Sequence, residues 1–203
     1  LHRVDRRQRQ MCIRDSATLL GRGDLTEHQI FDGFTRNLPH EAWLAQQFGL
    51  SSVGDTSPTA ARNAMAAYGL TGADGTWFIL QPVHLHIARD HLVLTDPQQL
   101  QLAEEDARSL FDIAQPLFAE TGQTLLYGDA QTWFLRADEL QALQTSTPSA
   151  ACGHNIDIWM PKGDKERDWR RLQNEVQMHW HAHPTNEARE MRGLKPVSYT
   201  HLR

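Results

Sequence analysis

The sequence predicts an α+β protein in which helices pack on one face of a mainly antiparallel sheet. Two pairs of short β-rich segments are each joined by a tight turn, and amphipathic helical segments alternate with these pairs. The composition is also that of an ordinary globular protein. Of 203 residues, 40% are hydrophobic and 22% are charged, which separates the chain from low-complexity and disordered sequences.

Two short helices are predicted before the first strand. The segment from Pro39 to Phe48 begins with proline, has an apolar stripe that includes Trp43, and is followed by Gly49. The second helix is expected to begin at Thr56-Ser57-Pro58 and to end at Gly69.

Five segments rich in β-branched, aromatic and aliphatic residues are expected to be strands, four of them in two hairpins. They are Thr76–Val83, Leu85–Ala88, His91–Leu94, Thr124–Tyr127 and Gln131–Leu135. Arg89 and Asp90 suit the turn of the first hairpin, and Gly128-Asp129-Ala130 suits the turn of the second.

The remaining helices follow from apolar periodicity. A long amphipathic helix is predicted from Asp96 to Glu120, and a short one from Ala137 to Leu143. Residues 145–153 are expected to be a polar linker, and Asn155–Met160 a further strand. A final helix is predicted from Asp164 to Ala182, with either His179 or Trp180 continuing its apolar face.

The two ends of the chain differ from the rest. Residues 1–16 (LHRVDRRQRQMCIRDS) and residues 197–203 (VSYTHLR) both resemble translated sequencing-adapter read-through, which recurs at the ends of reading frames on metagenomic contigs. We therefore expect one α+β domain over residues 17–196, truncated at its C-terminus. The alternative is a natural basic arm or transit peptide at the N-terminus.

Charge and composition exclude several classes of function. The formal net charge is −5, and residues 17–196 contain 14 basic and 23 acidic residues, a net charge of −9. A nucleic-acid partner is not expected for such an acidic chain. The longest apolar runs, such as Trp77–Leu80, are too short to span a membrane. Two cysteines cannot form a disulfide framework and fit a reducing compartment, so we expect a cytoplasmic protein.

The histidine-rich motifs do not predict a metal site. In His179-x-His181-x-His183, alternate residues of a helix point about 200° apart, so only His179 and His183 share a face. A metal pair there, or at His84-x-His86 on a strand, is less expected than packed or hydrogen-bonded histidines. The glycine turns match no nucleotide-binding motif. No metal and no cofactor is therefore predicted.

One polar segment suggests a ligand. His183-Pro184-Thr185-Asn186, followed by Arg189, joins a helix end to a charged turn. Such side chains could hold a small anionic ligand. The competing interpretation is a capped junction between two helices, in which these residues stabilise the turn.

The C-terminal third resembles the RpfE-type regulatory proteins of proteobacteria, a family often labelled cofactor-independent phosphoglycerate mutase-like. The resemblance covers about residues 60–196 and is strongest after Gly153. It is carried by Gly153-His154-Asn155-Ile156-Asp157, Met160-Pro161-x-Gly163, Trp169-x-x-Leu172-Gln173-Asn174-Glu175, His181-x-His183-Pro184-x-Asn186 with Arg189, and Gly193-x-x-Pro196-Val197. In that family an Asn-Ser-Leu-Trp-rich segment follows the Pro-Val pair, where this chain has Ser198-Tyr199-Thr200.

The resemblance implies a regulatory or ligand-binding protein without a complete catalytic set in this segment. The alternative is a cofactor-independent phosphoglycerate mutase whose site is completed by a missing C-terminal part. Mutase chemistry of this kind requires a Ser or Thr nucleophile beside metals held by Asp and His, and no segment groups these residues. The candidate ligand-binding residues are Asn155, Asp157, His179, His183, Asn186 and Arg189. The catalytic residues and the protein partner stay open.

Overall fold

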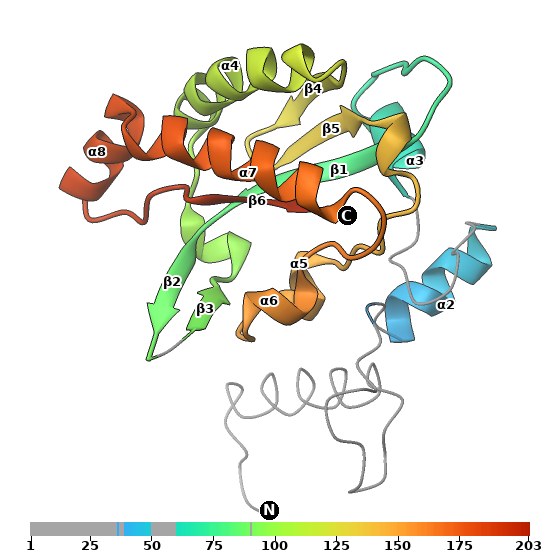
Figure 1. Cartoon of the computed structure of the whole chain (residues 1–203), viewed down its shortest axis with the longest axis horizontal. Helices are drawn as coiled ribbons and strands as arrows, with labels where there is room; N and C mark the ends of the chain where they lie inside the picture. The colour runs from blue at the N-terminus through green and yellow to red at the C-terminus, as the bar shows by residue number, and fades with distance from the viewer. Residues whose placement is uncertain (1–35, 37–38, 50–59, 90) are drawn as a thin grey trace, which may run out of the picture.

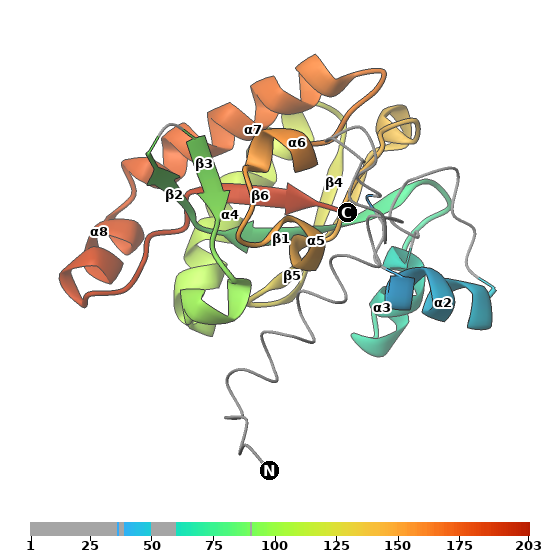
Figure 2. The same cartoon turned by 90° about the horizontal axis from the view of Figure 1, so that it is seen from below.

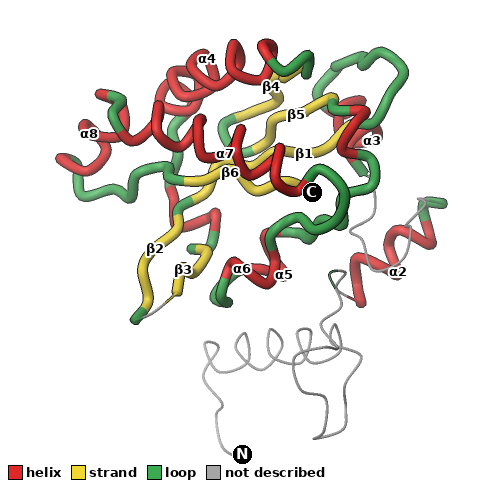
Figure 3. Tube along the Cα trace, in the orientation of Figure 1, coloured by secondary structure: helices red, strands yellow, loops and turns green. Residues whose placement is uncertain are grey.

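A four-stranded antiparallel sheet forms the centre of the protein (Figure 1). The computed structural model describes residues 36, 39–49, 60–89 and 91–203. The strand order is β4-β5-β1-β6. The strands are β1 (Trp77–Val83), β4 (Thr124–Asp129), β5 (Thr132–Arg136) and β6 (Tyr199–Leu202). Figure 3 shows helices beside these strands, and with the antiparallel pairing of the sheet the predicted α+β class is confirmed.

The first predicted hairpin forms a separate two-stranded sheet. Strands β2 (Leu85–Ala88) and β3 (His91–Leu94) pair antiparallel, with Ile87 opposite Leu92. The hairpin continues directly from β1 and extends beyond the main sheet (Figure 1). Its strand bounds agree with the prediction.

Helices α4 (Glu104–Glu120) and α7 (Glu166–His181) pack against each other and cover one face of the sheet (Figures 1 and 2). Trp180 connects the layers, because its indole N–H donates to the Leu110 carbonyl at 2.9 Å and its ring meets Trp133 edge-to-face. Both tryptophans are fully buried. Burial of such large rings contributes several kcal/mol to stability. Trp180, and not the exposed His179, thus continues the apolar face of α7.

The opposite face of the sheet is covered by α3 (Ala61–Ala67). Alternate residues of β1 serve the two faces: Phe78 and Leu80 face α4 and α7, whereas Trp77 and Ile79 pack with Met65 of α3. The prediction that helices cover only one face is therefore wrong. The continuous apolar run in β1 is the sequence signal of a strand buried on both faces.

The long helix predicted from Asp96 is divided in two. A 3₁₀ turn, η1 (Pro97–Leu100), is capped by the Asp96 carboxylate, which accepts from the Gln98 N–H at 3.0 Å. Gln101 then adopts a left-handed conformation with φ of 48° and ends this turn before α4 begins.

The predicted strand at Asn155–Met160 is wrong, because this segment forms helix α6 (Ile156–Trp159). The Asn155 side chain caps α6 by accepting from the Asp157 N–H at 3.0 Å. The predicted polar linker also contains a helical turn, α5 (Pro148–Ala151), capped by Thr147. The short helix predicted after Ala137 is only a 3₁₀ turn, η2 (Asp138–Leu140).

Helix α2 (Pro39–Gln47) forms near the predicted bounds, and two aromatic residues of the predicted stripe are exposed. Trp43 and Phe48 are 59% and 70% exposed, whereas Ala45 is buried. The start of the second predicted helix and the segment 1–16 lie outside the described residues.

The segment with the adapter-like sequence contributes the edge strand β6. Its register places Leu202 opposite Leu80 and Tyr199 opposite Val83, and all four strand residues are buried. Side-chain amides of Gln173 and Gln177, one turn apart on α7, donate to the Thr200 and Ser198 carbonyls. That this sequence is foreign to the protein stays a prediction.

Candidate functional site

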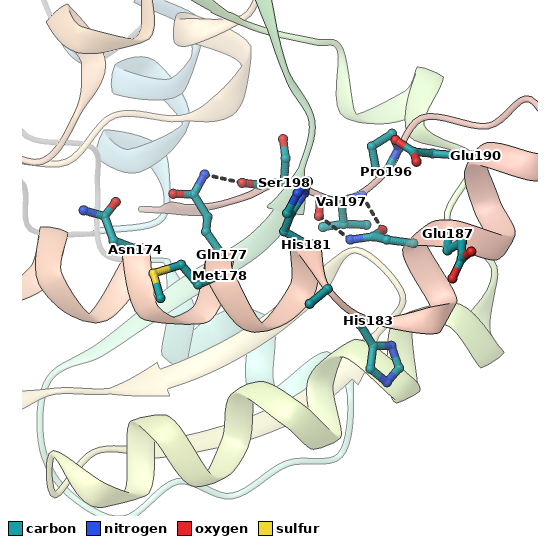
Figure 4. Close-up of a pocket in the computed structure, with 12 residues that line it drawn as sticks. Asn174, Gln177, Met178, His181, His183, Glu187, Glu190, Pro196, Val197 and Ser198 are labelled. Carbon is teal, nitrogen blue, oxygen red and sulfur yellow. Dashed lines mark hydrogen bonds between the residues drawn. The ribbon is translucent and has the colours of Figure 1, made fainter.

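A groove of about 760 Å³ lies where the C-terminal end of α7 meets α8 (Pro184–Met191) and the extended segment 196–198 (Figure 4). This volume is within the range of small-molecule sites. Its lining combines amide, imidazole, carboxylate and apolar side chains. The lining residues are Asn174, Gln177, Met178, His181, Ala182, His183, Asn186, Glu187, Glu190, Pro196, Val197 and Ser198.

Asn186 fixes the wall of the groove. Its buried side-chain amide donates to the carbonyls of Trp180 and Val197 at 2.9 and 2.8 Å, and its Oδ1 accepts from the Val197 N–H at 2.8 Å. These three bonds use both amide hydrogens and one of the two lone pairs of Oδ1. Asn186 therefore lies at the groove and shapes its wall, and both of its N–H groups are used within the protein.

Replacing Asn186 by alanine is expected to destabilise the protein by about 2–3 kcal/mol, because the buried Val197 N–H and carbonyl lose their partner and the Trp180 carbonyl keeps only the His183 N–H. Denaturant unfolding of the full chain measures this loss. The control is Asn174→Ala, since Asn174 also lines the groove but is exposed. Equal stability of the two variants would contradict the assigned role.

His183 is the N-cap of α8 and lines the groove. Its Nδ1 accepts from the Thr185 N–H at 3.3 Å. An accepting nitrogen has no proton, so the neutral ring carries its proton on Nε2 and donates there. A metal ion would require a lone pair at Nε2 and hence the loss of this cap. The junction of α7 and α8 is thus capped, as the competing interpretation expected, and its polar side chains also line the groove.

Arg189 points away from the groove into the protein core. Its guanidinium is fully buried, donates to Asp106 Oδ2 at 2.9 Å and to the Leu100 carbonyl at 2.5 Å, and is also bonded to the carbonyls of Gln101 and Lys195. These contacts join η1, the start of α4 and the chain after α8. Arg189 is therefore not a ligand-binding residue of the groove.

The other predicted residues do not line the groove. Asn155 caps α6, and Asp157 is exposed in the first turn of that helix. His179 is exposed on α7 and shares a shallower hollow of about 430 Å³ with His183 and Ile113. Of the six candidates, only His183 and Asn186 line the groove between α7 and α8. In the part of the chain that the structure describes, no three His, Cys, Asp or Glu side chains gather as a metal site.

The wall formed by residues 196–198 is also held from the side of the β2 hairpin. His84 Nδ1 lies 2.9 Å from the Pro196 carbonyl, to which it must donate, and the Leu85 N–H donates to Ser198 Oγ at 2.9 Å. Burial lowers the pKa of His84, against the Pro196 contact, which raises it. The groove thus has a wall anchored on both sides.

Sequence reasoning missed the contribution of α7 to the groove. Asn174, Gln177 and Met178 line it with His181, at helical spacings of three and four residues. The Gln177 amide donates to the Ser198 carbonyl (Figure 4). Their polar and exposed positions are ordinary for the solvent face of a helix, so no sequence signal distinguishes them.

No protein-family model matches this sequence, and comparisons with curated proteins and with solved structures gave no significant match. Among the described residues, no helix combines the length and apolar character needed to cross a bilayer. The structure is thus an α+β fold with a candidate small-molecule site at the groove between α7 and α8.

Proposed function

We propose that this chain is a ligand-binding protein with a regulatory role, of the RpfE-type kind that its sequence resembles, and that its ligand binds in the groove between α7 and α8. The supporting observation is the groove itself, in which His181, His183 and Asn186 of one sequence motif meet the wall at Pro196 and Val197. A cytoplasmic location is part of this proposal and rests on cysteine usage.

The lining favours binding over catalysis. Ser198 is its one hydroxyl, and the Ser198 Oγ is engaged by the Leu85 N–H. A nucleophile needs a base at hydrogen-bond distance, and the described groove residues show no such pair. The alternative, a cofactor-independent phosphoglycerate mutase, would further require acidic and imidazole ligands arranged around metal ions. The described residues contain no such group.

Blocking the groove tests this proposal. We expect that Ala182→Trp, at an exposed position in the lining, weakens binding of a small molecule by at least tenfold. The probes are putrescine, inorganic phosphate and 3-phosphoglycerate, each titrated calorimetrically into the full chain. Ala119→Trp, at an exposed position on α4 outside the groove, is the matched control and should bind as the original chain does.

Two results would contradict the proposal. One is that no probe binds, or that binding is equal in the Ala182→Trp and Ala119→Trp variants. The other is manganese-dependent conversion of 3-phosphoglycerate to 2-phosphoglycerate by the intact chain that is lost in His183→Ala, which would support the mutase alternative.

A further inference from the structure

The fixed charges that line the groove are negative. Glu187 and Glu190 lie three residues apart on α8, and both are exposed. Lysine and arginine are absent from the described lining. Figure 4 shows the Glu190 carboxylate beside Pro196, at the wall of the groove. At pH 8, where an imidazole is ordinarily uncharged, these two carboxylates set the sign of the local potential.

The two neighbouring arginines are engaged elsewhere. Arg189 and Arg192 both donate to Asp106 Oδ2, at 2.9 and 2.8 Å, on the side of α8 that faces α4. Lys195 precedes the wall residue Pro196 but is not part of the lining. The C-terminal end of α7 and the N-terminal end of α8 meet here, so their opposite dipoles largely offset each other. Among these described residues, one nearby cation, Lys195, therefore remains against two carboxylates of the lining.

The uncharged part of the lining suits a short apolar chain with hydrogen-bond donors. Met178, Ala182 and Pro196 supply apolar surface. Because the Gln177 amide donates to the Ser198 carbonyl, its Oε1 is left as an acceptor. Carboxylates and a carbonyl oxygen are the groups that an ammonium ion binds.

Given the proposed ligand site, we infer that the groove selects a small organic amine, with ammonium groups at the Glu187 and Glu190 carboxylates and methylene groups on the apolar lining. This sign of charge is opposite to the anionic ligand that the sequence motif suggested. The reason is that Arg189, the cation of that motif, lies in the core. A phosphate-bearing ligand would be repelled by the same carboxylates.

The test compares charge classes on the full chain at pH 8 and low ionic strength. Putrescine is expected to bind, and inorganic phosphate and 3-phosphoglycerate are not. The double variant Glu187→Gln/Glu190→Gln should weaken putrescine binding about five- to tenfold, as expected for two exposed charge contacts. Adding 150 mM NaCl should also weaken it. The control is Glu175→Gln, an exposed carboxylate of α7 outside the groove, which should change binding less than twofold.

The outcomes separate this inference from the proposed function. Putrescine binding that the double variant leaves unchanged would overturn the inference. Binding of phosphate or 3-phosphoglycerate that is abolished by Ala182→Trp would also overturn it, while the groove would stand as the ligand site. Putrescine binding that Ala182→Trp leaves unchanged would place the ligand elsewhere and would contradict both.

Discussion

Replacing Arg189 by methionine is expected to lower the free energy of unfolding by about 3–5 kcal/mol. The fully buried guanidinium is bonded to the Asp106 carboxylate and to the carbonyls of Leu100, Gln101 and Lys195. Methionine fills a similar volume but removes the donor from the three carbonyls and leaves Asp106 with Arg192 alone. Urea unfolding, followed by tryptophan fluorescence, measures the change.

Arg192 provides a matched control for Arg189. It donates to the same Asp106 Oδ2 at 2.8 Å, but its side chain is 50% exposed. Exposed ion pairs contribute at most about 1 kcal/mol, so Arg192→Ala should have a small effect. If Arg189→Met were as mild as Arg192→Ala and instead abolished ligand binding, Arg189 would be the anion-binding residue that the motif suggested.

The second large effect is a loss of stability in acid that depends on His201. This residue is fully buried in β6, and its Nε2 lies 2.7 Å from the Ser146 carbonyl, to which it donates. Its Nδ1 has no partner among the described residues. Burial, opposed by the Ser146 contact and aided by the nearby cations Arg203 and Arg36, lowers the pKa of His201 to about 4. The acidic group near these cations is Glu41, whose charge raises the pKa of Arg203.

The sign of the effect follows from proton uptake. Between pH 6.5 and 4 the unfolded chain binds a proton at this histidine and the folded chain does not, so stability rises with pH in this window. The free energy of unfolding is therefore highest, as far as His201 is concerned, above pH 6.5. It falls by about 3 kcal/mol in total as the pH is lowered toward 4.

Glutamine at position 201 tests this account. Since its amide can still donate to the Ser146 carbonyl but does not titrate, His201→Gln should remove most of this pH dependence. The measurement is urea unfolding at several pH values between 4 and 7.5. His179→Gln, at an exposed histidine of α7, should leave it unchanged. If the free energy of unfolding of His201→Gln still falls between pH 6.5 and 4 as in the original chain, other groups cause the loss of stability.

The strands and long helices could be predicted because local pattern and tertiary burial agree there. The hairpin of β2 and β3 has the predicted bounds, since alternating β-formers flank a two-residue turn. The strand prediction at Asn155–Met160 failed because two features outweighed its β-branched and aromatic residues. The Asn155 side chain caps a helical turn. The Arg36 guanidinium donates to the carbonyl of Ile158 within this turn and to that of Met160, which follows it.

The candidate site could be predicted only in part. The motif around His183 and Asn186 marks the right junction, because capping residues and ligand-binding residues are of the same types. Pattern alone could not show that Arg189 turns into the core, since its partner Asp106 lies 83 residues earlier in the chain. The polar residues of α7 at the groove resemble any solvated helix face.

The central claim is that the groove between α7 and α8 is the ligand site, and amide chemical shifts during a titration test it most directly. With putrescine added to the ¹⁵N-labelled full chain, the account predicts saturable shifts confined to residues 174–198, largest at Gln177, Ala182 and Glu190. Shifts centred outside this range, or no shifts at millimolar putrescine, would contradict it.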